Sequence, residues 1–136
     1  MLLKVVITLI VSVLAVVNGF FCTPANVTVD ATFLCANQAV ANALVELLEH
    51  DLFDPDDVLS AEKTSANGNV ILVGEECEIG RIEPYLMITH HCYTGKIRNE
   101  CTVVDLIEVP QEYIGKVYRV TGYYLDKHKP HYSVKC

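Results

Sequence analysis

The sequence lacks the patterns of several large protein classes. It contains no CxxC pair, which argues against a zinc ribbon or a thioredoxin-like redox site. It has no long basic run and a formal net charge of −7, so nucleic acid is not an expected partner. Helical periodicity is scarce, and the one long apolar run, 5–17, is shorter than the roughly 20 residues that a membrane-spanning helix needs. These absences leave a small, acidic, mainly β protein.

The N-terminal segment has the layout of a secretory signal peptide. Lys4 is followed by the aliphatic run 5–17, which only Thr8 and Ser12 interrupt, and then by Asn18 and Gly19. A charged start, a short apolar run and a small-residue exit predict export and cleavage after Gly19, with a retained anchor as the alternative. We therefore expect a signal peptide at 1–19, one domain at 20–136, and a secreted, extracellular protein. Removal of Lys4 leaves 9 basic and 17 acidic residues, a formal charge of −8.

The cysteine content fits an exported chain, because an even number of cysteines in an oxidising compartment predicts disulfides. Six cysteines allow 15 pairings. The cysteines are Cys22, Cys35, Cys77, Cys92, Cys101 and Cys136. Asn26-Val27-Thr28 is an acceptor sequence for N-glycosylation, placed at the start of the first predicted strand.

Alternation of apolar and polar residues predicts about seven short strands. The predicted strands are 27–33, 44–50, 58–64, 70–74, 85–91, 102–109 and 117–124. Asn67-Gly68 favours a type I′ turn, and so a hairpin between the third and fourth strands. Short strands separated by turn signals predict a β-sandwich.

Two groups of side chains could bind a metal. The loop residues Asp51, Asp54, Asp56 and Asp57 offer oxygen ligands of the kind that calcium takes, but their spacing is not that of an EF-hand, and a solvated turn is the simpler interpretation. His90 and His91 are adjacent on a predicted strand and so point to opposite faces. His128 or His131 could join one of them at a zinc or copper site; otherwise one imidazole is partly buried with a hydrogen-bond partner and the other is exposed.

Catalysis is not expected, although His131 and Ser133 would share a face of a strand. A nucleophile also needs a base within reach and an orienting group, and nothing in the sequence indicates the third group. Seven tyrosines accompany the absence of tryptophan. Since tyrosine suits interfaces, Tyr93, Tyr124 and Tyr132 are predicted to form an exposed interface cluster; core packing is the alternative.

Four blocks of residues, in order along the chain, resemble the nematode transthyretin-like family. The blocks are Leu34-Cys35 with Asn42, Val45 and Leu47; Asp54-Pro55-Asp56-Asp57-Val58-Leu59; Ile82-Glu83-Pro84-Tyr85-Leu86; and Val109-Pro110-Gln111-Glu112-Tyr113-Ile114. The chain departs from the family pattern at Ala36-Asn37-Gln38-Ala39, where the family has Asn-Gly-Lys-Pro, and at Met87 and His91. Cys22 and Cys77 are additions to a four-cysteine framework.

The resemblance implies a secreted all-β protein with a seven- to eight-stranded Greek-key sandwich of the transthyretin or prealbumin type, without a cofactor. It implies the disulfides Cys35–Cys136 and Cys92–Cys101, which leaves Cys22–Cys77. Hydroxyisourate hydrolase shares that fold and ends in Tyr-Arg-Gly-Ser, a tail that this chain lacks.

The sequence therefore favours an extracellular binding or bridging protein that recognises a protein or a membrane surface. A carrier of a small apolar ligand or lipid is the alternative, and a hydrolase is the least favoured one. Loops at one end of the sandwich, or an exposed sheet edge, would carry the binding.

Overall fold

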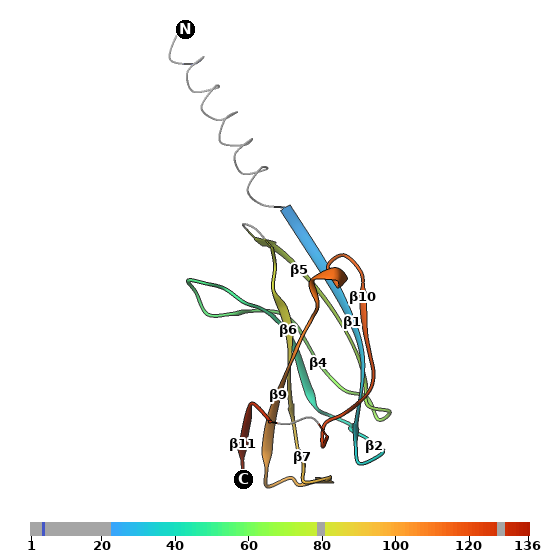
Figure 1. Cartoon of the computed structure of the whole chain (residues 1–136). Coiled ribbons are helices and arrows are strands. Elements are labelled where there is room, and N and C mark those ends of the chain that lie inside the picture. Colours follow the sequence, from blue (N-terminus) through green and yellow to red (C-terminus); the bar gives the residue numbers. More distant parts are fainter. Residues whose placement is uncertain (1–3, 5–22, 79–80, 128–129) are drawn as a thin grey trace.

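A computed structural model describes Lys4 and residues 23–78, 81–127 and 130–136 of the chain (Figure 1). The predicted signal peptide and its cleavage point lie outside the described residues, apart from Lys4. Within the described part, no helix combines the length and the apolar character needed to cross a bilayer.

The described residues form two β-sheets whose inner faces share one apolar core. In the first sheet the long strand β1 (Thr23–Cys35) pairs on one side with β10 (Val117–Tyr124), in parallel. It pairs antiparallel with β5 (Asn69–Glu78) and, past the end of β5, with the short β2 (Gln38–Ala39). Figure 1 shows β5 and β10 beside β1.

The second sheet has five strands in the order β11-β9-β6-β3-β4. These strands are β3 (Leu44–Glu49), β4 (Asp57–Lys63), β6 (Pro84–His90), β9 (Thr102–Glu108) and β11 (Ser133–Lys135). A two-stranded ribbon, β7 (Cys92–Tyr93) with β8 (Lys96–Ile97), and the 3-10 helix η1 (Gln111–Tyr113) complete the described elements. The fold is thus the predicted all-β sandwich.

The alternation found in the sequence explains which face of each strand is buried. In β1 the residues Val27, Val29, Ala31 and Phe33 point into the core, where they meet Leu72 of β5 and the inner residues of the second sheet. Burying such side chains contributes about 1.5–3 kcal/mol each. All seven predicted strands are present, with boundaries shifted by a few residues.

The predicted hairpin at Asn67-Gly68 is wrong. A turn is present, since Gly68 N–H donates to Ser65 O at 2.9 Å, but Asn67 does not take the positive φ of a type I′ turn. The strands on either side belong to different sheets: β4 pairs with β3, and β5 pairs with β1. Gly68 has φ +78°, and a Cβ there would lie 2.5 Å from Phe33 O, so this position needs glycine to let the chain cross between sheets.

The disulfides that the resemblance implied are also corrected. Cys35 is bonded to Cys92, and Cys101 to Cys136, in place of Cys35–Cys136 and Cys92–Cys101. Register explains the second bond, because Lys135 lies opposite Thr102 in the β9–β11 pair and so brings Cys136 beside Cys101. Cys92 is buried and faces Cys35 at the end of β1, with 5.9 Å between the Cα atoms. Cys77 is also in a disulfide, and Cys22, its expected partner, lies outside the described residues.

Candidate binding site

The two ends of the sandwich carry different chemistry. We call the end that holds the Cys35–Cys92 and Cys101–Cys136 disulfides the disulfide end. The end at which β3 stops and β6 begins is the loop end, because the β3–β4 loop, 50–56, leaves the body of the protein there (Figure 1).

The β3–β4 loop presents two large apolar side chains to solvent. Leu52 is 91% exposed and Phe53 is 93% exposed, more than any other large apolar residue in the described part of the chain. Isolated apolar residues on a surface are common, but two adjacent ones that are almost fully exposed at a loop tip form a candidate contact site.

Hydrogen bonds inside the loop hold its shape. Asp51 N–H donates to Asp56 Oδ1 at 3.1 Å, and Phe53 N–H donates to Asp51 Oδ1 at 3.3 Å. At its base, His50 N–H donates to Glu83 O at 3.2 Å, which ties the loop to the segment before β6. Leu52 and Phe53 therefore stand on an ordered scaffold, which lowers the entropy cost of using them for binding.

A cluster of His50, Tyr85 and Asp56 anchors the loop to the outer face of the second sheet. The His50 ring stacks on Tyr85 with 4.3 Å between centroids, and His50 Nδ1 lies 3.2 Å from Asp56 Oδ2. The Tyr85 hydroxyl donates to the same carboxylate. This bond and the one from Asp51 N–H lower the pKa of Asp56, while burial and the bonded carboxylate raise the pKa of Tyr85.

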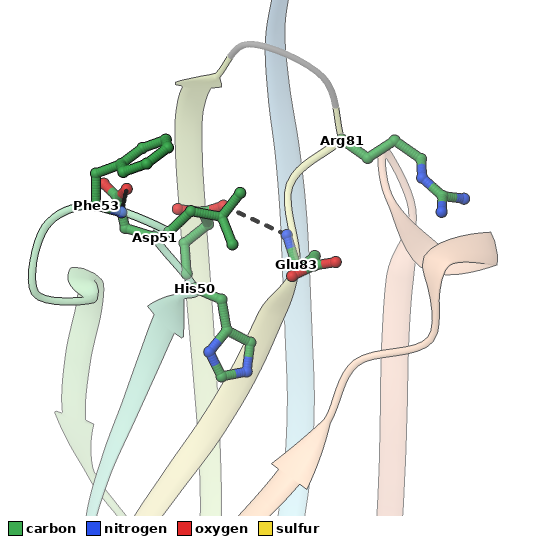
Figure 2. A pocket seen from close by; sticks show the side chains of 7 residues that line it. His50, Asp51, Phe53, Arg81 and Glu83 are labelled. Atoms are coloured by element: carbon green, nitrogen blue, oxygen red, sulfur yellow. Dashed lines mark hydrogen bonds between the residues drawn. The ribbon is translucent and has the colours of Figure 1, made fainter.

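Two pockets lie at the base of the loop. One, of about 530 Å³, is lined by the loop together with Glu49, Arg81 and Glu83. Figure 2 shows Asp51 and Phe53 on one side of it and Glu83 on another; the dashed line is the bond that Glu83 N–H donates to Glu49 Oε1 at 3.4 Å. The second pocket, of about 430 Å³, is lined by His50, Glu83, Glu108 and the segment that follows β9. Their ionisable lining favours charged groups over an apolar small molecule.

The geometry favours the solvated-turn interpretation of the acidic loop. Asp51 and Asp56 use carboxylate oxygens to accept hydrogen bonds from the loop backbone, while Asp54 and Asp57 are exposed. Among the described residues, the clusters of ligating side chains close enough to share an ion do not include these four.

A buried carboxylate joins two histidines at the disulfide end. His90 Nε2 donates to Asp105 Oδ2 and His131 Nδ1 donates to Asp105 Oδ1, both at 2.7 Å. The Asp105 and His131 side chains are only 6% and 7% exposed, so these hydrogen bonds offset the cost of removing the carboxylate from water. His131 directly precedes β11, and the cluster therefore fastens the last strand to β9. Burial of the Tyr123 side chain, and secondly the charge of Asp105, raise the pKa of Tyr123.

The His90–Asp105–His131 cluster does not fit a metal. Cys92 N–H donates to His90 Nδ1 at 2.9 Å, so the neutral His90 ring carries its proton on Nε2, the atom that faces Asp105. A metal at Nε2 would require the proton at Nδ1, against the Cys92 N–H. The prediction that one of the two adjacent histidines is buried with a hydrogen-bond partner and the other exposed is confirmed. His90 is the buried one and His91 the exposed one. His128 lies outside the described residues.

The remaining predicted residues do not form one site. Tyr132 is exposed and Tyr93 is partly exposed, with its ring 6.3 Å from that of His131, while Tyr124 lies under the ammonium of Lys127. No described contact joins the three tyrosines. His131 and Ser133 share a segment, but no described hydrogen bond connects them, because His131 binds Asp105.

The sequence analysis did not identify Leu52 and Phe53 at the loop end or Asp105 at the disulfide end. Leu52 and Phe53 could have been found as an apolar pair inside an acidic loop, where no alternation accounts for them. Asp105 interrupts the core-facing positions of β9, between Val103 and Ile107, and a charge at such a position signals a buried partner.

Comparison with known proteins identifies the family of this chain. The model of the transthyretin-like family matches residues 31–110. Transthyretin-like protein 16 of Caenorhabditis elegans is 39% identical over 121 residues, which cover 88% of this chain and 90% of that protein. The chain belongs to the transthyretin-like family. Within this family, transthyretin-like protein 46 of the same organism is 36% identical over 99 residues, 71% of this chain and 55% of that protein.

A solved structure is also similar. It is that of a 9R-lipoxygenase from Cyanothece PCC8801, with 13% identity and a TM-score of 0.49 over 74% of this chain and 16% of that one. A similarity of this size carries no argument.

Proposed function

We propose that this transthyretin-like protein is an extracellular binding protein that inserts Leu52 and Phe53 into an apolar socket on a partner protein. The single observation that carries the proposal is the near-complete exposure of both side chains on a loop that is held by its own hydrogen bonds. Protein interfaces concentrate their binding free energy in a few such anchors, which bury large side chains at the centre of the contact.

The charged residues near Leu52 and Phe53 indicate which charges should surround the socket on the partner. Asp51 and Asp54 flank the apolar pair in the sequence, and Glu83 lines the same pocket as Leu52 and Phe53, together with Arg81. An acidic rim is complementary to lysine and arginine side chains on the partner, and such complementarity speeds association and excludes acidic surfaces.

The same charges argue for a protein rather than a membrane. Complete burial of Leu52 and Phe53 would contribute about 3–6 kcal/mol, which is comparable to the marginal anchoring of one acyl chain. Anionic headgroups would repel Asp51, Asp54 and Asp57. A protein socket supplies both the apolar cavity and the opposite charge.

Site-specific photo-crosslinking tests the proposal. A benzophenone amino acid replaces Phe53 or, as a control, the half-exposed Ile97 of β8 at the disulfide end, and the protein is incubated with extracellular fluid of its source organism. We expect one crosslinked protein of defined mass from position 53, weakened by added salt, and none from position 97. Equal crosslinking from both positions, or none from position 53, would overturn the proposal.

Vesicles provide the competing outcome. The protein is sedimented with vesicles of phosphatidylcholine alone and of phosphatidylcholine with phosphatidylserine, with and without calcium. We expect it to remain in the supernatant in every case. Sedimentation that the Leu52→Ser, Phe53→Ser variant loses would replace the protein partner with a membrane surface.

A further inference from the structure

The outer face of the four-stranded sheet combines an N-glycosylation sequence with a strip of exposed apolar side chains. Because neighbours on a strand alternate between faces, burial of Val27 and Val29 places Asn26, Thr28 and Asp30 on the outer face of β1. The Asn26 side chain is exposed, and its backbone carbonyl accepts a hydrogen bond from Gly115 N–H at 2.6 Å, so the strand holds this position firmly.

The apolar strip lies directly beside Thr28, the other outward-facing residue of the acceptor sequence. Thr28 pairs with Val73 of β5 on one side and with Val117 of β10 on the other. Val73 is 61% exposed, Val117 is partly exposed, and Ile71, opposite Asp30, is 63% exposed. Val73 and Val117 thus flank a position two residues, or about 7 Å, along β1 from Asn26, and Ile71 lies opposite a position four residues, or about 13 Å, along it.

We propose that Asn26 carries an N-linked oligosaccharide that lies over Val73, Val117 and Ile71 and shields them from other proteins. The inference goes beyond the binding loop and needs only that the chain enters the secretory pathway. In the transfer, Asn26 Nδ2 attacks the anomeric carbon of a lipid-pyrophosphate-linked oligosaccharide. The N–C bond forms, the bond from that carbon to the phosphate oxygen breaks, and the lipid pyrophosphate leaves with the amide proton.

The fold accounts for the site in two ways. Asn26 and Thr28 point away from the core, so a bulky sugar at Asn26 disturbs no packing. A sugar at position 27 or 29 would not fit, because Val27 and Val29 are buried. A soluble protein also gains from covering Ile71 and Val73, because exposed apolar residues on neighbouring positions promote association. The sugar occupies the outer face of the four-stranded sheet, whereas the β3–β4 loop leaves from the other sheet.

Mass spectrometry of the full chain secreted from a eukaryotic culture tests the modification. We expect an added oligosaccharide mass on the wild type and on Thr28→Ser, which keeps the acceptor sequence, and none on Asn26→Gln. Secreted wild type without the added mass would overturn the inference. A chain retained inside the cell without sugar would overturn it too, but through failed export, which the location of the protein distinguishes.

Retention on a hydrophobic-interaction column tests the shielding. Asn26→Gln is expected to be retained longer than the glycosylated wild type. Adding Ile71→Thr and Val73→Thr should shorten retention of Asn26→Gln much more than that of the wild type. If both substitutions act equally with and without the sugar, the oligosaccharide does not cover the strip, and that part of the proposal fails.

Discussion

At the disulfide end, two covalent bonds and the His90–Asp105–His131 cluster close the sandwich around buried polar atoms. At the loop end, weaker hydrogen bonds shape a loop that leaves Leu52 and Phe53 in water. This difference predicts that substitutions at the disulfide end reduce the stability of the fold more than substitutions at the tip of the β3–β4 loop. A rigid scaffold with variable exposed loops commonly divides its work in this way.

The largest expected effect is loss of the buried disulfide at the closed end. Replacing Cys35 and Cys92 together by alanine removes a bond that spans 57 residues. Chain entropy alone predicts a loss of about 4 kcal/mol in the free energy of unfolding, measured by urea titration. A loss below about 1 kcal/mol would show that the stability does not reside at this end.

The next effect is expected at the buried carboxylate. Asp105→Asn offers one carbonyl oxygen where His90 and His131 both donate, so one ring loses its acceptor. We expect a loss of about 2–3 kcal/mol, because a buried N–H donor is left without its acceptor, together with faster amide exchange in β11. Asp54→Asn at the exposed loop is the matched control. Unchanged exchange in β11 would contradict the fastening role of the cluster.

A smaller effect is expected at the anchor of the loop. Because the Tyr85 hydroxyl is the main cause of the lowered pKa of Asp56, Tyr85→Phe should raise that pKa. A carboxyl whose pKa is lowered in the folded state stabilises the fold at pH values above its unfolded-state pKa of about 3.9. This stabilisation is lost as the pH falls through the folded-state pKa. Loop order should therefore be lost at a higher pH in Tyr85→Phe. An NMR titration of the Asp56 carboxyl that does not move would refute this.

The smallest effect on stability is expected at the tip. Leu52→Ser with Phe53→Ser removes no buried contact, so the free energy of unfolding should change by less than about 0.5 kcal/mol. Calorimetry of this variant beside Ile97→Ser provides the comparison. A clear loss of stability in the tip variant alone would mean that the two side chains support the fold.

The sequence predicted the strands well because alternation reports burial, and burial is local along a strand. It did not predict which strands pair, since the turn at Asn67-Gly68 suits a hairpin and also a crossing between sheets. The predicted disulfide pairing was wrong for a related reason. Which cysteines meet depends on the strand register across the sheet, and this register brings Cys136 beside Cys101.

The candidate site was predicted only in part. The acidic loop was recognised, but the prediction followed its carboxylates rather than Leu52 and Phe53 between them. The absence of alternation around Leu52 and Phe53 indicates a loop, but their near-complete exposure follows only from the path of that loop in the folded structure. The sequence points to His90 and His131 as possible neighbours, but not to Asp105, which joins them and is distant from both along the chain.

The central claim is that the tip of the β3–β4 loop binds a partner protein, and a competition measurement tests it most directly. Protein carrying the photo-crosslinker at position 53 is mixed with an excess of unlabelled wild type, or of the Leu52→Ser, Phe53→Ser variant. We expect the wild type to abolish the crosslinked product and the variant to leave it unchanged. If the variant competes as well as the wild type, Leu52 and Phe53 do not carry the binding, and the account is contradicted.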